Sequence, residues 1–234
     1  MGPGYCVIGL EQVSFDLFRS VRPMPPGAFA WREPFPYQRG ARVKCTLTPL
    51  PTSPPHTEDR QSEGLAAAGP SLSEHELLQF LLKAEVASDL EHLFACPLNR
   101  STAGGNVWVD PDKATRSICG CLYENIRFRV FEDPEGLTLR AQLLLASGER
   151  LNSLPVVDRE WRRYLYRVLD HLRRSQPNPQ PEAFLNRSIR SRLLAAPQRV
   201  VRLGLARPNG GKCWVMLDSL FPQPQLSWLE DPRT

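Results

Sequence analysis

The chain has 234 residues, of which 41% are hydrophobic and 9% aromatic, and its formal net charge is +4 at pH 7. This apolar content can offset the entropy cost of ordering a chain, so the composition excludes a wholly disordered protein. No apolar run approaches the roughly 18 residues of a membrane span. No secretory leader precedes the first strand-like segment, which predicts an intracellular protein of the nucleus or cytoplasm with free thiols.

The N-terminal part of the chain predicts short strands joined by proline-rich segments. Residues 5–21 favour one strand or two short ones, and 41–47 favour another, because Val43, Cys45 and Leu47 alternate. We treat residues 1–47 as an arm. Residues 48–72 combine Pro, Ser, Thr, Gly and charge with almost no large apolar side chain, so we expect a flexible linker there.

Three segments of the main body predict helices. The first begins at Ser73, where Ser73 and Glu76 fit a capping box, and is expected to end near Cys96. The second covers 156–175, with Asp158 as its N-cap and an apolar stripe of Trp161, Leu165, Val168, Leu169 and Leu172. The third runs from about Pro181, a good first-turn residue, to position 196.

Two hairpins predict the sheet. Residues 118–131 and 137–146 flank a five-residue turn that contains Pro and ends in Gly, and residues 200–205 and 213–217 flank a second turn. A short strand is expected at 106–109. Hairpins without regular β-α-β alternation predict an α+β fold, with a mainly antiparallel sheet covered by two or three helices. The main domain is expected to span 73–221 and to be followed by a proline-rich tail, 222–234.

Arginine is the most specific compositional feature. It supplies 25 of the 29 basic residues, and the segment 127–207 carries a net charge of +8 against −4 for the rest. The arginines expected to point outward from the first hairpin and the second helix are Arg127, Arg129, Arg140, Arg162, Arg163, Arg167, Arg173 and Arg174. If combined in one surface, they would attract nucleic-acid phosphates or an acidic partner. The plain alternative is a solvated face, partly neutralised by neighbouring acids.

Aromatic residues in the proline-rich segments predict a second kind of contact. Phe29, Trp31, Phe35 and Tyr37 in the arm, with Trp228 in the tail, are candidates for docking into the groove of a partner protein. The equally strong alternative is that they pack on their own domain.

Catalytic and metal-binding signals are weak. His92 and Cys96 share a helix face and Cys119 and Cys121 share a strand face, so together they present an acceptable zinc ligand set. The alternative is that the cysteines are small core residues. His92 with Cys96 is also the one candidate thiol pair. No nucleophile elbow or phosphate-binding loop is present.

These features predict a non-catalytic interaction or adaptor subunit of a larger intracellular assembly, with an arginine-rich surface and another protein as its partner. The alternative is a nucleic-acid-binding accessory protein, and the more remote one a zinc- or thiol-dependent enzyme. We expect no cofactor, no membrane contact and no small-molecule substrate.

Overall fold

The structure is a computed structural model in which most of the chain is described. The described residues are 6–14, 17–28, 30–31, 38–51, 53–84, 86–87, 89–101, 106–133 and 136–229. The strands are β1 (Gly9–Gln12), β2 (Phe18–Met24), β3 (Val43–Pro49), β4 (Asp59–Ala67), β5 (Val86–Ala87), β6 (Asn99–Arg100), β7 (Val107–Val109), β8 (Ile118–Asp133), β9 (Gly136–Leu145), β10 (Arg150–Pro155), β11 (Val200–Leu205) and β12 (Cys213–Phe221). The helices are α1 (Glu74–Ala84), α2 (Leu90–Leu93), α3 (Arg159–Ser175), α4 (Pro181–Phe184), the π-helical turn η1 (Leu185–Ile189), α5 (Arg190–Ala195) and the 3₁₀ turn η2 (Leu226–Trp228).

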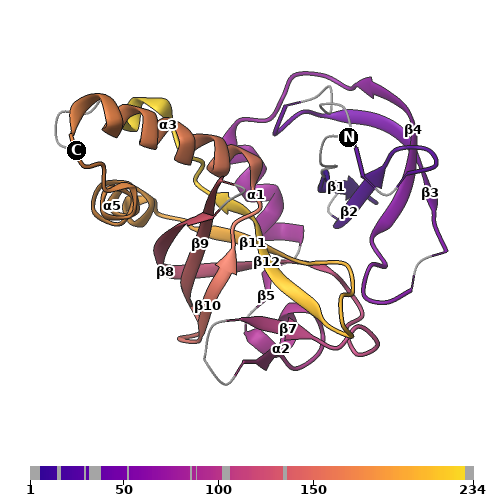
Figure 1. Ribbon diagram of the computed structural model, residues 1–234. Coiled ribbons are helices and arrows are strands. Elements are labelled where there is room, and N and C mark those ends of the chain that lie inside the picture. The colour runs from indigo at the N-terminus through magenta and orange to yellow at the C-terminus, as the bar shows by residue number, and fades with distance from the viewer. Residues whose placement is uncertain are drawn as a thin grey trace.

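Two sheets organise the molecule, as Figure 1 shows. The N-terminal sheet has the order β1-β2-β4-β3, and the larger sheet has the order β10-β9-β8-β11-β12-β7-β6, with β5 beside β8. Most neighbours are antiparallel, with β2–β4 and β5–β8 as parallel pairs. The predicted α+β class and mainly antiparallel sheet are therefore confirmed, as are both predicted hairpins, β8–β9 and β11–β12.

The larger sheet curls so that β10, the first strand in this order, meets β12, the fifth. Val156, directly after β10, forms a parallel bridge with Leu217 of β12. The amide of Val157 also donates to the carbonyl of Leu217, at 2.9 Å. The strands β8, β9, β10, β12 and β11 consequently enclose a small barrel, from which β7 and β6 extend beyond β12.

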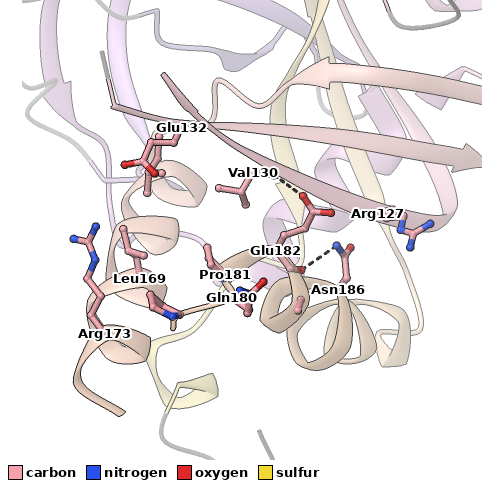
Figure 2. A pocket seen from close by; sticks show the side chains of 12 residues that line it. Arg127, Val130, Glu132, Leu169, Arg173, Gln180, Pro181, Glu182 and Asn186 are labelled. Atoms are coloured by element: carbon pink, nitrogen blue, oxygen red, sulfur yellow. Dashed lines mark hydrogen bonds between the residues drawn. The ribbon is translucent and has the colours of Figure 1, made fainter. Parts of the chain in front are cut away.

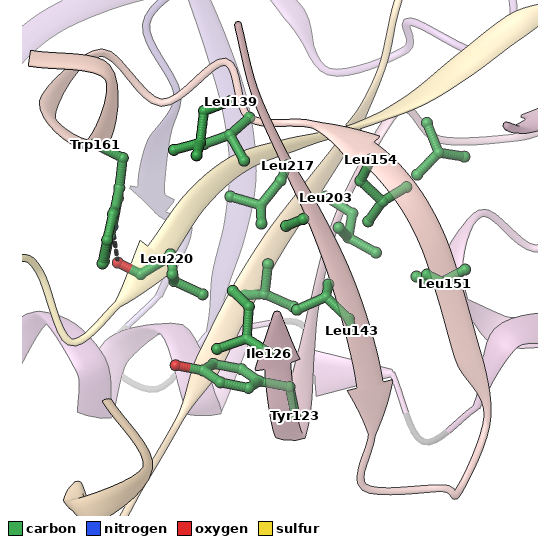
Figure 3. Packing of buried hydrophobic residues seen from close by; sticks show 14 of the residues in the cluster. Tyr123, Ile126, Leu139, Leu143, Leu151, Leu154, Trp161, Leu203, Leu217 and Leu220 are labelled. Atoms are coloured by element: carbon green, nitrogen blue, oxygen red, sulfur yellow. Dashed lines mark hydrogen bonds between the residues drawn. The ribbon is translucent and has the colours of Figure 1, made fainter. Parts of the chain in front are cut away.

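The barrel is filled by the inward side chains of its strands (Figure 3). Alternation along β8 turns Ile126 and Phe128 inward and leaves Arg127 exposed, because successive side chains of a strand point to opposite faces. Trp161 of α3 stacks on Phe128 with ring centroids 5.3 Å apart, and it is fully buried. Burying a large apolar side chain of this kind contributes roughly 1.5–3 kcal/mol.

Helix α3 begins where the sequence predicts. The Asp158 carboxylate accepts from the amides of Glu160 and Trp161, at 2.9 and 3.3 Å, which satisfies two amides that have no partner inside the helix. All five members of the predicted apolar stripe are buried. The stripe attaches α3 to the barrel and leaves its arginine-rich face on the outside.

The segment α4–η1–α5 covers the open edge of β8. Strand β11 pairs with β8 only as far as residue 122, so the second half of β8 has an edge without a strand partner. Glu182 Oε2 accepts from the amide of Val130 at 3.1 Å (Figure 2). Asn186 accepts from the amide of Phe128 and donates to its carbonyl, both at 2.8 Å. Because Glu182 and Asn186 are four residues apart, one helix face replaces a missing strand.

We predict that Asn186→Ala destabilises the protein by about 1–3 kcal/mol, because it leaves both backbone groups of Phe128 without a partner at a half-buried edge. Urea unfolding monitored by circular dichroism measures the change. Asn178→Ala is the matched control, since Asn178 is an exposed amide in the loop before α4. Equal unfolding midpoints for both variants would contradict this role of Asn186.

The predicted linker, 48–72, is wrong in its central part. Residues 59–67 form β4, which pairs with β3 on one side and β2 on the other. Asp59 and Ser62 are buried, and Ser62 Oγ donates to the carbonyl of Met24 at 2.9 Å. Composition indicated flexibility because the segment lacks apolar bulk, but its polar side chains find partners distant in the sequence.

The single helix expected from Ser73 to Cys96 is also wrong in its second half. The capping box is present, with Ser73 N donating to Glu76 Oε2 at 2.8 Å and Glu76 N donating to Ser73 Oγ at 3.2 Å. Helix α1 then ends at Ala84, and the short strand β5 pairs with β8. Val86 is β-branched and favours strand over helix, which a pattern of apolar spacing does not reveal.

A buried polar cluster joins the N-terminal sheet to the barrel. Arg22 Nη1 and Arg207 Nη2 bind the two oxygens of Asp59, at 3.0 and 2.5 Å. Arg22 Nη2 donates to Ser117 Oγ at 3.1 Å, and Ser117 in turn donates its amide to Glu58 Oε1 at 2.7 Å. Buried charges need such compensation, so this cluster fixes the position of one sheet against the other.

Asp218 lies at the border of this cluster and makes the stability depend on pH. Burial raises the pKa of its carboxyl group to about 6 from an ordinary 3.8, although Arg22 of β2 and Arg202 of β11 lower it and Asp158 raises it further. The close packing is evident at Gly204, where an added Cβ would lie 1.8 Å from Asp218 Oδ2. The folded state therefore holds the proton more tightly than the unfolded chain, and protonation stabilises the fold as pH falls from about 6 towards 3.8.

We predict from this sign that Asp218→Asn gains stability relative to the unmodified protein as pH rises from about 4 to 6, and that the difference then levels off. Chemical denaturation at several pH values measures the difference in unfolding free energy between the two proteins. Asp112→Asn, at an exposed turn, serves as the control for replacing a carboxylate by an amide. A difference that is constant across this range would contradict the raised pKa.

Candidate functional site

The outer face of β8, β9 and β10 carries a patterned row of polar side chains. The register places Arg127 opposite Gln142 and Asn125 opposite Leu144. On the other side of β9, Leu144 lies opposite Arg150. Because these residues occupy the outward positions of adjacent strands, their side chains form one continuous floor.

A groove of about 510 Å³ lies on this floor. Side chains of η1 and α5 form its wall. The groove is lined by Asn125, Ile126, Arg127, Gln142, Leu143, Leu144, Arg150, Asn152, Asn186 and Arg190. Three of these residues are arginines and four are amides, and no acidic side chain lines the groove within the described part of the chain. We call this site the arginine groove.

Two of the three arginines are available to a ligand. Arg127 and Arg150 are exposed, and in the described ranges neither forms an ion pair. Arg190 has a structural contact, since its Nε donates to Asn125 Oδ1 at 2.9 Å. A guanidinium presents a planar fork of donors, so Arg127 and Arg150 are suited to bind a phosphate or carboxylate bidentately.

The same face continues along β8 towards the hairpin turn. Arg129 is exposed, and Phe131, two residues further on, is 47% exposed. An exposed aromatic ring beside arginines is a feature of surfaces that bind single-stranded nucleic acid, because bases stack on such rings. The arginine groove and its extension together have the charge and chemistry for an anionic, flat-ringed ligand.

Arg140 has a structural role, unlike the open position expected for it. Its Nη1 donates to Asn106 Oδ1 at 3.0 Å and to the carbonyl and Oγ of Ser153 at 2.7 and 3.0 Å. Ser153 has a φ of 55°, a conformation that costs energy for a non-glycine residue, and it lies in a bulge of β10. Arg140 therefore holds this bulge in place.

The arginines of α3 form a separate surface. Trp161 attaches α3 to the inner side of β8, whereas Arg127 and Arg129 point outward from the same strand. The exposed arginines of α3 are Arg162, Arg163, Arg167, Arg173 and Arg174. Arg163 pairs with Glu160 at 2.9 Å, and Arg174 pairs with Asp170. The single basic surface expected from the sequence is thus divided in two.

A second pocket, of about 620 Å³, separates the two surfaces (Figure 2). Arg127 and Arg173 lie at its opposite ends, while Val130 and Leu169 contribute apolar lining. Unlike the arginine groove, it is also lined by two carboxylates, Glu132 and Glu182. Its mixed charge makes it a poorer site for a phosphate.

The residues considered for zinc are not brought together. Cys96, Cys119 and Cys121 are buried, but His92 is exposed and its Nδ1 lies 2.6 Å from Asp89 Oδ1. Within the described residues, no group of three or more potential ligands is arranged to hold a metal ion. Burial raises the pKa of the Cys96 thiol, so it is poorly prepared as a nucleophile.

The aromatic docking candidates that can be placed contact their own chain. Trp31 Nε1 donates to the carbonyl of Pro23 at 3.0 Å, and Trp228 packs against the main core. Phe29, Phe35 and Tyr37 lie outside the described residues. Packing on their own domain, the alternative considered above, applies to Trp31 and Trp228.

Comparison with known proteins adds no relative: no family model, no curated protein and no solved structure matches this chain. In the described ranges, no helix has the length and apolar character needed to cross a membrane.

Six polar residues of the arginine groove were not predicted as site residues from the sequence: Asn125, Gln142, Arg150, Asn152, Asn186 and Arg190. Gln142 carries no functional signal in the sequence, and β10, which holds Arg150 and Asn152, was not predicted as a strand. A turn at Gly148 followed by Leu151 and Leu154 is the one local sign of β10.

Proposed function

We propose that the protein is a non-catalytic subunit that binds single-stranded nucleic acid in the arginine groove. The observation that carries this proposal is the lining of the groove, which has three arginines and four amides but no carboxylate. Phosphate contacts from Arg127 and Arg150 would supply affinity, and the amide side chains would contact bases.

The connectivity of the barrel supports the same site by an independent route. Its strands follow in the order β8, β9, β10, β12, β11 around the barrel. The third and fifth strands along the chain, β10 and β12, meet in parallel, and the helices α3, α4 and α5 lie between β10 and β11. This connectivity is shared with the OB-fold, a five-stranded Greek-key barrel that binds oligonucleotides or oligosaccharides on its second and third strands. Those strands are β9 and β10 here, which carry Gln142, Arg150 and Asn152.

The shape of the groove favours a single strand over a duplex. Asn186 and Arg190 of η1 and α5 rise beside the floor and narrow it. A flexible single strand can enter such a channel with its bases turned towards the protein, whereas a duplex presents its bases only within its own grooves.

A second partner is favoured by the arginines of α3. Arg162, Arg167 and Arg173 are exposed and form no ion pair in the described part of the chain. We propose this surface as the contact for an acidic segment of a partner protein in a larger intracellular assembly.

Binding of fluorescent oligonucleotides, measured by anisotropy, tests the nucleic-acid proposal. We expect micromolar or tighter binding to single strands, weaker binding to the matched duplex, and a steep loss of affinity with salt. Absence of binding to any oligonucleotide at low salt would reject the proposal.

A further inference from the structure

Two amide side chains occupy neighbouring positions at the centre of the arginine groove. Leu143 of β9 lies opposite Leu151 of β10, and the bulge that follows places both Asn152 and Ser153 against Gln142. Both side chains line the groove and both are half-buried. Arg127 lies opposite Gln142 on the far side, and Arg150 is two residues before Asn152.

These two amides differ from the other two in the groove because they have no role in the fold. Asn186 uses its oxygen and its nitrogen on the backbone of Phe128, and Asn125 Oδ1 accepts from Arg190. In the described ranges, by contrast, neither Gln142 nor Asn152 forms a side-chain hydrogen bond. Their donors and acceptors are therefore available to a ligand.

The groove itself offers hydrogen bonding rather than stacking. Its lining contains no aromatic side chain, and the exposed ring of Phe131 lies outside it. Proteins that bind single strands without base preference depend on stacking, which every base can provide. A base that enters this groove instead meets amide groups, which distinguish one base edge from another.

On these grounds we propose that Gln142 and Asn152 make the groove selective for adenine, an inference that rests on the proposed binding of single-stranded nucleic acid. An amide presents a donor and an acceptor side by side, and this pair matches the N6 amino group and N7 of adenine. Guanine presents two acceptors on the same edge and is better matched by arginine. Arg127 and Arg150, on either side of the amides, are left for the phosphates before and after the recognised base.

The test uses thymidine oligonucleotides of about 12 residues, which covers the site size of one barrel of this type. Each carries a single central dA, dC or dG, and binding is measured by fluorescence anisotropy at fixed salt. We expect dA to increase affinity about tenfold over the all-thymidine strand, within the range that one bidentate contact provides. Gln142→Ala and Asn152→Ala should each reduce this increase to about twofold or less.

Two further measurements separate base recognition from folding and from phosphate binding. Both alanine variants should keep the thermal unfolding midpoint and the salt dependence of binding to the all-thymidine strand, because phosphate contacts set that dependence. Asn178→Ala, which removes an exposed amide outside the groove, should keep the full preference for dA.

Equal affinity for all four strands would overturn the selectivity and leave the proposed function standing. A preference for dC or dG that equals or exceeds that for dA would overturn it as well. No binding to any strand would reject the proposed function, and the selectivity with it.

Discussion

Replacing Asp59 by Asn is expected to lower the free energy of unfolding by about 3–5 kcal/mol. Asp59 has no exposed area, and its two oxygens bind Arg22 at 3.0 Å and Arg207 at 2.5 Å. Asparagine keeps the shape but removes the negative charge, so the buried guanidinium of Arg22 loses its counter-ion. Urea unfolding at pH 7 measures the loss.

The neighbours of Arg22 replace the charge of Asp59 only in part, since Asp218 attracts Arg22 but forms no ion pair with it in the described part of the chain. His56 lies 3.1 Å from Arg22, and burial together with the charges of Arg22 and Arg207 lowers its pKa to about 4, so its ring is neutral at pH 7. The carboxylate of Glu58 is already bonded to Ser117.

A surface ion pair provides the control for this prediction. Asp170→Asn removes the partner of Arg174, but both side chains are well exposed, so we expect a loss below about 0.5 kcal/mol. If Asp59→Asn costs no more than this control, the cluster does not join the two sheets in the way described.

The parts of the fold that the sequence predicted correctly are those decided by neighbours along the chain. The apolar stripe of α3, its cap at Asp158 and the alternation of Ile126, Arg127 and Phe128 are local patterns with fixed periods. Each was confirmed because burial of the apolar side alone selects one helix face or one strand face.

The parts that the sequence analysis missed depend on long-range partners or on broken periods. Strand β4 is built from polar residues whose counter-charges, such as Arg207, lie far along the chain. Strand β10 contains a bulge after Leu151, so Leu151 and Leu154 face the core at a spacing of three instead of two. Without β10 there is no barrel, and Arg150 and Asn152 cannot be recognised as parts of a site.

The division of the arginines into two surfaces leads to the second large effect. We expect the double substitution Arg127→Glu and Arg150→Glu to weaken single-strand binding on the order of 100-fold at low salt, since it removes two charge-assisted phosphate contacts and adds repulsion. The slope of log affinity against log salt should become shallower by roughly 1.4, about 0.7 for each lost contact. Both residues are exposed and form no ion pair in the described part of the chain, so the fold should be retained.

The matched control is Arg162→Glu with Arg167→Glu on α3, which changes the net charge by the same amount on the other surface. Non-specific attraction depends mainly on total charge, so it would weaken about equally in both double variants. A groove that contacts phosphates directly loses affinity only when its own arginines change, and the α3 variant should then bind within about threefold of the unmodified protein. The reverse pattern, with loss confined to the α3 variant, would move the nucleic-acid site to that helix and leave the groove without a role in binding.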